Sequence, residues 1–143
     1  MTDDLLGSGL DEVHAEIVRL HDFFTGWFTG TLPKDAFEDG ISACLHATFE
    51  NVQPAGKTLT RDVLLTGLRA AHGVNPDFRI EIRETRILGV WPECGLILAG
   101  YVEAQFGARN TTPADNLRRS TALFKRSGAL LVWRYVHETA IPA

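Results

Sequence analysis

The chain has 143 residues, of which 45% are hydrophobic and 22% charged, and its formal net charge is -4. These values exclude a disordered chain, and the length suits one domain, spanning residues 1–143, with a proper hydrophobic core. The acidic balance argues against nucleic acid or an anionic membrane surface as a partner, because both attract clustered basic residues.

Cysteine and histidine spacing predicts no metal site. Cys44 and Cys94 form no Cys-x-x-Cys pair, so we expect reduced thiols in a cytoplasmic protein. His14 and His21 lack a carboxylate that would complete a metal-binding pattern. The sequence has no glycine-rich phosphate loop and therefore predicts no cofactor. Its acidic start is unlike a signal peptide, and no apolar run is long enough to span a membrane.

The first half of the chain predicts helices. Behind a capping Ser8, apolar residues recur at spacings of three and four and predict a helix that closes at Gly30, with residues 1–8 as a flexible tail. The apolar stripe consists of Leu10, Val13, Ile17, Leu20, Phe24 and Trp27. A shorter helix is predicted from Pro33 to Leu45, weakened by its glycine at position 40.

A small hairpin and a third helix follow. The segments ATFENV and TLT, separated by PAGK, predict two short strands joined by a turn. Thr60 is a suitable N-cap for the next helix, which is expected to stop at Gly73.

The second half predicts long antiparallel strands. The segments FRIEIRETRIL and GLILAGYVEAQF are followed by a polar connector and by a hairpin that turns at Ser127-Gly128. Helices first and strands afterwards indicate an α+β fold, in which helices pack on the concave side of a curved antiparallel sheet.

The last strand carries an unusual alternation. Trp133, Tyr135 and His137 fall on one face by the two-residue period of a strand, and these side chains suit a pocket wall. On the strand GLILAGYVEAQF, Tyr101 and Glu103 share a face. If both faces line one cavity, Glu103 and His137 are the candidate catalytic pair.

Other residues are candidates for the same pocket wall. They are Phe24, Trp27, Phe49, Glu50, His72, Arg119 and Thr121, of which Glu50 and His72 form a second possible acid-base pair. The aromatic residues among them also fit an ordinary core. A reversed parity would instead place Val102 and Val136 inside, because a bulge moves every later side chain to the other face.

The order of elements, with three local features, resembles the nuclear transport factor 2-like superfamily in its SnoaL-like branch. The features are the aromatic end of the first helix (residues 23–28), the segment ATFENVQPAGKTLTRDVLLTGL, and the final WRYVHET. The resemblance implies a cone-shaped, cystatin-like roll around a pocket, commonly dimerised through the outer face of the sheet. Phe49-Glu50 matches the Phe-Glu of the kinase II association domain. Many relatives end in His-x-His-x-Ser, whereas His137-Glu138-Thr139 keeps a single histidine.

Two functions are compatible with this resemblance, because the fold carries different chemistry in different members. One is a small-molecule pocket, in its catalytic form a cofactor-independent lyase, isomerase or cyclase for a small apolar substrate. His137 or Glu103 would then be the base, and Tyr101 or Tyr135 would donate to the oxyanion. The alternative is a non-catalytic homodimeric binding or scaffolding module.

The state of the cavity separates these two hypotheses. A continuous cavity that reaches Glu103 and His137 favours the enzyme, whereas one filled by Trp27, Trp133 and Phe124 favours the scaffold. The predicted homodimer interface is the outer face of the sheet, where the favoured parity leaves Val102, Phe106 and Val136.

Overall fold

The structure is a computed structural model that describes residues 2–109 and 111–142, with side chains from residue 9 onward. It is an α+β fold, with helices on one side of a curved six-stranded sheet in the order β2-β1-β6-β5-β4-β3. The strands are β1 (Leu45–Val52), β2 (Thr58–Thr60), β3 (Arg79–Trp91), β4 (Leu96–Phe106), β5 (Asn116–Ser127) and β6 (Leu130–Ile141).

The sheet is mixed, whereas the sequence predicted a purely antiparallel one. β1 pairs with β6 in parallel, and the other neighbours are antiparallel. The long hairpin of β5 and β6 turns at Gly128, whose positive φ of 60° suits glycine in a tight turn, as the sequence predicts.

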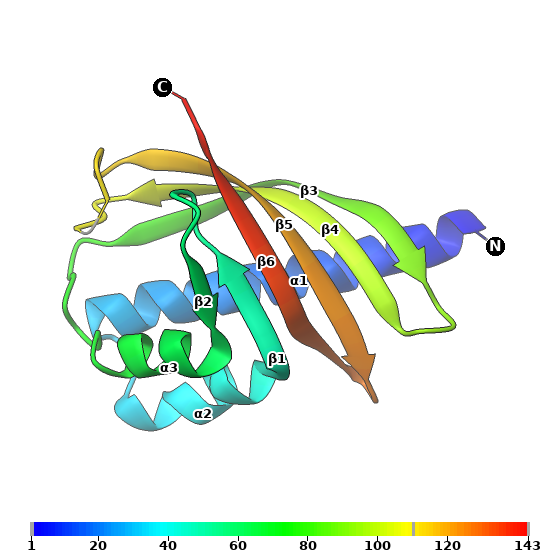
Figure 1. Cartoon of the computed structure of the whole chain (residues 1–143), viewed down its shortest axis with the longest axis horizontal. Coiled ribbons are helices and arrows are strands. Elements are labelled where there is room, and N and C mark those ends of the chain that lie inside the picture. Colours follow the sequence, from blue (N-terminus) through cyan, green and yellow to red (C-terminus); the bar gives the residue numbers. More distant parts are fainter. Residues whose placement is uncertain (1, 110, 143) are drawn as a thin grey trace.

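The helices cover one face of this sheet. They are α1 (Thr2–Thr29), the 3-10 turn η1 (Lys34–Ala36), α2 (Phe37–Gly40), the 3-10 turn η2 (Ser42–Cys44) and α3 (Arg61–Arg69). Figure 1 shows α1 crossing the sheet, with α2 and α3 grouped at one end. No helix among the described residues has the length and apolar character needed to cross a membrane.

Three helix boundaries differ from the expectations, and one of them is the end of α3, which lies at Arg69 rather than at Gly73. α1 begins at Thr2, so residues 2–8 belong to the helix. The predicted helix start after Ser8 is therefore wrong. The single helix expected over Pro33 to Leu45 is broken into η1, α2 and η2, and α2 ends at Gly40. The start of α3 is confirmed, because the Thr60 hydroxyl accepts a hydrogen bond from the Val63 amide at 3.4 Å.

Trp27 connects α1 to α3 inside the core. Its indole N–H donates to the Leu68 carbonyl at 2.6 Å, and its ring packs on Phe23 and Phe37. The Trp27 carbonyl accepts from the amides of Gly30 and Gly73. A buried indole with a satisfied N–H thus ties α1 to α3 at this end of the sheet.

Gly40 gives a test of this packing. A Cβ at Gly40 would lie 2.4 Å from Cδ2 of the buried Phe23 ring, whereas a Cβ at Gly67, exposed on α3, meets nothing within 4 Å. We expect Gly40→Ala to lower the free energy of unfolding by about 1–3 kcal/mol through overpacking. The control Gly67→Ala should raise it by roughly 0.5–1 kcal/mol, because alanine favours a helix interior. Urea denaturation measures both, and a Gly40→Ala protein as stable as Gly67→Ala would contradict the packing.

Candidate functional site

A cavity of about 210 Å³ lies between the helices and the sheet. Most of its wall is apolar and comes from α1, β1, α3, β6 and the segment before β3, including Leu20, Phe24, Phe49, Leu64, Leu68, Phe78 and Trp133. Its polar lining residues are His21, Asn51, Gln53, Tyr101, Glu103, Gln105, Arg118 and Glu138. A mainly apolar space with a few convergent polar groups is the usual form of a small-molecule site.

A buried histidine and carboxylate form the first polar cluster. His21 of α1 and Glu103 of β4 are 3.0 Å apart between Nε2 and Oε1, with side chains 6% and 5% exposed. The other ring nitrogen, Nδ1, lies 2.7 Å from the Ile17 carbonyl oxygen. Gln105 donates from its amide to the second oxygen of Glu103 at 2.6 Å.

A second carboxylate lies on β6. Glu138 accepts hydrogen bonds of 3.3 Å from the Arg118 guanidinium and from the Asn51 amide. Asn116 joins the two clusters, because its amide nitrogen donates to Gln105 and its amide oxygen accepts from Arg118 Nε. The polar groups therefore form one continuous network from the Ile17 carbonyl to Asn51.

The environments of the two carboxylates shift their pKa values in opposite directions. Burial raises the pKa of Glu103, but the charge of His21 and the hydrogen bonds from His21 and Gln105 outweigh burial and bring this pKa below its usual range. Burial and the charge of Glu103 raise the pKa of Glu138, against the opposing effects of Arg118 and Asn51.

The pKa values of two neighbours of Glu103, His21 and Tyr101, are shifted as well. Burial lowers the pKa of His21, but the charge and hydrogen bond of Glu103 outweigh it, so the pKa is raised. Burial, together with the charges of Glu103 and Glu138, raises the pKa of Tyr101 well above its usual value. Tyr101 therefore keeps its proton at neutral pH and is able to donate a hydrogen bond.

Several residues predicted from the sequence lie in the cavity wall. They are Phe24, Phe49, Tyr101, Glu103 and Trp133. Trp27 instead belongs to the core behind the wall, and His72 contacts Trp27 and the Leu32 carbonyl away from the cavity.

The predicted placement of His137 and Tyr135 in the pocket is wrong. β6 contains an extra residue at Arg134, since Phe124 pairs with Trp133 but Leu123 pairs with Tyr135. This bulge turns the later side chains over, so Val136 and Glu138 face inward. His137 is exposed on the outer face, where its Nδ1 lies 3.2 Å from the Tyr135 hydroxyl.

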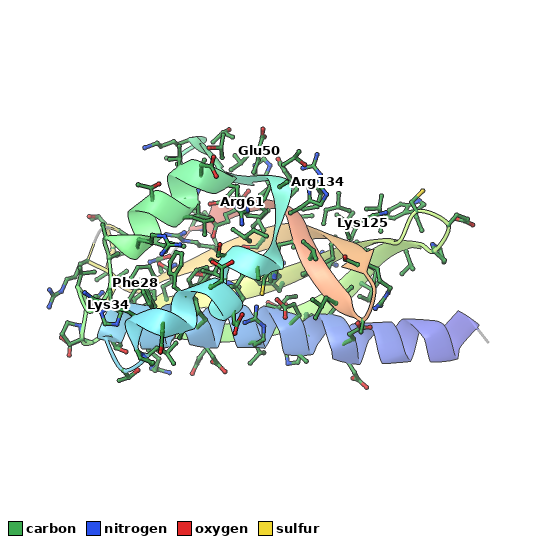
Figure 2. The ribbon with its side chains drawn as sticks, turned by 90° about the horizontal axis from the view of Figure 1, so that it is seen from below. Phe28, Lys34, Glu50, Arg61, Lys125 and Arg134 are labelled. Carbon is green, nitrogen blue, oxygen red and sulfur yellow. The ribbon has the colours of Figure 1, made fainter. Side chains whose placement is uncertain are left out.

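Glu50, Arg119 and Thr121 also lie on the outer face. Glu50 pairs with Tyr135, Thr121 with His137, and Arg119 with Val102, whereas the inward Glu103 pairs with Arg118. Figure 2 shows Glu50 and Arg134 on the side of the sheet away from α1. The predicted pair of Glu50 and His72 is therefore not formed.

The sequence did contain a signal for His21. It lies four residues after Ile17 and three before Phe24, so it shares the apolar stripe of α1 and must point into the core. A histidine at such a position requires a polar partner. Glu138 and Arg118 were not predicted, because β4 has the inward face that the sequence favours whereas β5 and β6 turn the opposite face inward.

The described residues contain no group of three or more His, Cys, Asp or Glu side chains arranged to hold a metal ion.

Comparison with known proteins gives matches in structure. No protein-family model and no curated protein matches the sequence. An NTF-2-like protein of unknown function from Pseudomonas aeruginosa is 26% identical, with a TM-score of 0.74 over 92% of this chain and 97% of its own. A Caulobacter vibrioides protein with a cystatin-like fold is 20% identical, with a TM-score of 0.68 over 94% and 91%.

A third similar structure carries a suggested activity. It is a Streptomyces avermitilis protein of the NTF2-like family, proposed to be a dehydratase, which is 11% identical with a TM-score of 0.72 over 96% of this chain and 99% of its own. The six-stranded curved sheet, the helices on its concave face and these likenesses agree, and the chain is a member of the nuclear transport factor 2-like superfamily with its cystatin-like α+β fold.

Proposed function

We propose that the cavity binds a small, mainly apolar molecule and that Glu138 transfers a proton in a cofactor-independent isomerase or lyase reaction. The observation that carries this proposal is the pair of buried carboxylates at the polar end of an apolar cavity, with pKa values displaced in opposite directions. Groups displaced in this way divide the roles of acid and base between them.

His21 is not the free base of this site. A carbonyl oxygen only accepts, so Nδ1 must carry a proton to bond Ile17. Nε2 faces Glu103, and the pKa of His21 is raised while that of Glu103 is lowered, so the pair is ionised and this nitrogen carries a proton as well. The resulting imidazolium has no lone pair to offer, and its role is to hold Glu103 in the ionised form.

Glu138 is the carboxylate that can change its protonation state. Its hydrogen bonds are long, at 3.3 Å each, and the fixed negative charge of Glu103 opposes its ionisation. It lines the cavity, so a ligand can reach its oxygens. A carboxyl group with a raised pKa accepts and returns a proton near neutral pH more readily than an ordinary glutamate.

Tyr101 supplies the complementary group. It lines the same cavity and remains protonated, so its hydroxyl is suited to donate to an oxygen that gains negative charge in the transition state. The Streptomyces protein proposed to be a dehydratase would fit this class, because dehydration is a lyase reaction that needs proton transfer.

The non-catalytic homodimer is the second candidate. The outer face of the sheet offers Leu88, which is 45% exposed, beside Gly100, together with the exposed Leu117. Val136 was expected on this outer face, but the bulge places it in the core instead. Val102 is on the outer side of β4 but is almost fully covered.

The ion pair gives a prediction for stability. Glu103→Gln leaves a buried histidine without its charged partner, and we expect a loss of about 3 kcal/mol in the free energy of unfolding near pH 5.5. The contribution of His21, whose pKa is raised from 6.5, is complete below pH 6.5 and disappears as pH rises through the folded-state pKa. The contribution to stability of Glu103, whose pKa is lowered from 4.5, is complete above pH 4.5 and disappears as pH falls through the folded-state pKa.

The difference between wild type and Glu103→Gln should therefore be largest between pH 4.5 and 6.5. Denaturation across pH measures it. Glu81→Gln, at an exposed carboxylate on β3, is the control and should show little change. A difference that stays the same well below pH 4.5 and well above pH 6.5 would contradict the ion pair.

Glu138 gives a prediction for catalysis. In deuterated water the protein should accelerate hydrogen exchange at the acidic C–H bonds of small ketones and enones such as cyclohex-2-enone, followed by NMR. Glu138→Gln should slow this exchange by about 100-fold or more, the usual contribution of a general acid or base. The control Glu50→Gln, on the outer face of β1, should keep the wild-type rate. Exchange that is absent in wild type, or unchanged in Glu138→Gln, would favour the non-catalytic module.

The homodimer is tested by sedimentation. A dimer of the 15.8 kDa chain should form at micromolar concentration, and Leu88→Glu should dissociate it by placing charge on the outer face. Val63→Glu, at an exposed residue of α3, should not. A wild-type protein that sediments as a monomer would rule out the interface.

A further inference from the structure

The size of the cavity limits its ligand. A cavity of roughly 150 Å³ holds benzene, so the 210 Å³ of this one corresponds to roughly eight to ten non-hydrogen atoms. The wall has little room to yield, because Phe49, Leu68 and Trp133 are buried core residues as well as lining residues. A molecule with one ring fits this volume, and a fused bicyclic molecule exceeds it.

The charges of the cavity limit its ligand further. Its ionisable cations are His21 and Arg118, and each already faces a carboxylate, Glu103 and Glu138 respectively. His21 has no N–H left for a ligand, because both ring nitrogens are engaged. A ligand carboxylate would therefore lie beside two acidic side chains without a free cation, and it would lose its hydration in a mainly apolar space.

The remaining polar groups suit an uncharged oxygen. Tyr101 and Glu138 reach the cavity from neighbouring positions of the sheet, since both flank Ser120 in the register. The Tyr101 hydroxyl is a donor, and Glu138 donates when protonated and accepts when ionised. The Tyr101 hydroxyl can donate to a carbonyl or hydroxyl oxygen, and so can protonated Glu138, whereas a purely hydrocarbon ligand offers neither group a hydrogen bond.

From this size, charge balance and donor placement we propose that the ligand is an uncharged, single-ring carbonyl or hydroxyl compound of roughly eight to ten non-hydrogen atoms. The inference rests on the proposed function, since it names the substrate class of the same cavity.

A matched set of ligands tests it at pH 7. Acetophenone and benzoate each have about nine non-hydrogen atoms and differ in charge, whereas 2-acetylnaphthalene keeps the ketone and has about thirteen, beyond the range that the cavity volume allows. Titration followed by NMR reports affinity, and shifts of the Trp133 indole N–H and the His21 ring locate binding in the cavity. We expect acetophenone to bind at least tenfold more tightly than either of the other two.

A pair of variants on one helix tests the size limit independently. Leu64 lines the cavity, whereas Val63 beside it is 55% exposed and does not line it. Leu64→Ala should increase the affinity for 2-acetylnaphthalene at least tenfold, and Val63→Ala should leave it unchanged. The wild-type comparison stands by itself if Leu64→Ala does not fold.

The outcomes separate the two proposals. Benzoate that binds as tightly as acetophenone would overturn the uncharged class, and 2-acetylnaphthalene that binds as tightly would overturn the size limit, while both results would leave the cavity as a ligand site. If none of the three ligands shifts the NMR signals of Trp133 and His21, both this inference and the proposed ligand-binding function are contradicted. Tight acetophenone binding without hydrogen exchange would support the inference and count against catalysis alone.

Discussion

A histidinium and a carboxylate facing each other in the interior are the interaction on which the site depends. His21 reaches from α1 and Glu103 from β4, so their contact fixes the helix over the sheet at the polar end of the cavity. Burying two charges is costly unless their remaining donors and acceptors are matched. Here the Ile17 carbonyl and the Gln105 amide provide the matching partners, and Asn116 extends the network to Arg118 and Glu138. The position of each carboxylate is thereby set by several elements at once.

The order of the elements and several local features could be predicted from the sequence. The cap at Thr60, the turn at Gly128 and the inward face of β4 with Tyr101 and Glu103 follow from local chemistry and from the two-residue period of strands. These features depend on short stretches of chain. A few neighbouring residues are enough to specify them.

The face of the last strand could not be predicted in the same way. The alternation of Trp133, Tyr135 and His137 continues through the sequence without interruption, while the backbone inserts Arg134 as a bulge. The bulge lies where β6 pairs with β5, and the Arg134 side chain there donates to the Thr48 carbonyl of β1, 86 residues away in the sequence. His21 is a different case, because its place on the apolar stripe of α1 was visible, and its significance required knowledge of its partner 82 residues away.

The parallel pairing of β1 with β6 has a consequence for synthesis of the protein. Asn51 of β1 bonds the Val136 carbonyl and Glu138 from a distance of more than 80 positions along the chain, so the polar end of the cavity joins an early segment to the last strand. Contacts of such long sequence separation form late, because the loop between them must first be ordered. A nascent chain that has not yet released β6 from the ribosome therefore has the helices and β1 but neither Glu138 nor the wall that carries it. The polar end of the cavity therefore forms only after β6 has been synthesised and has left the ribosome, because Glu138 and the Val136 carbonyl belong to that strand.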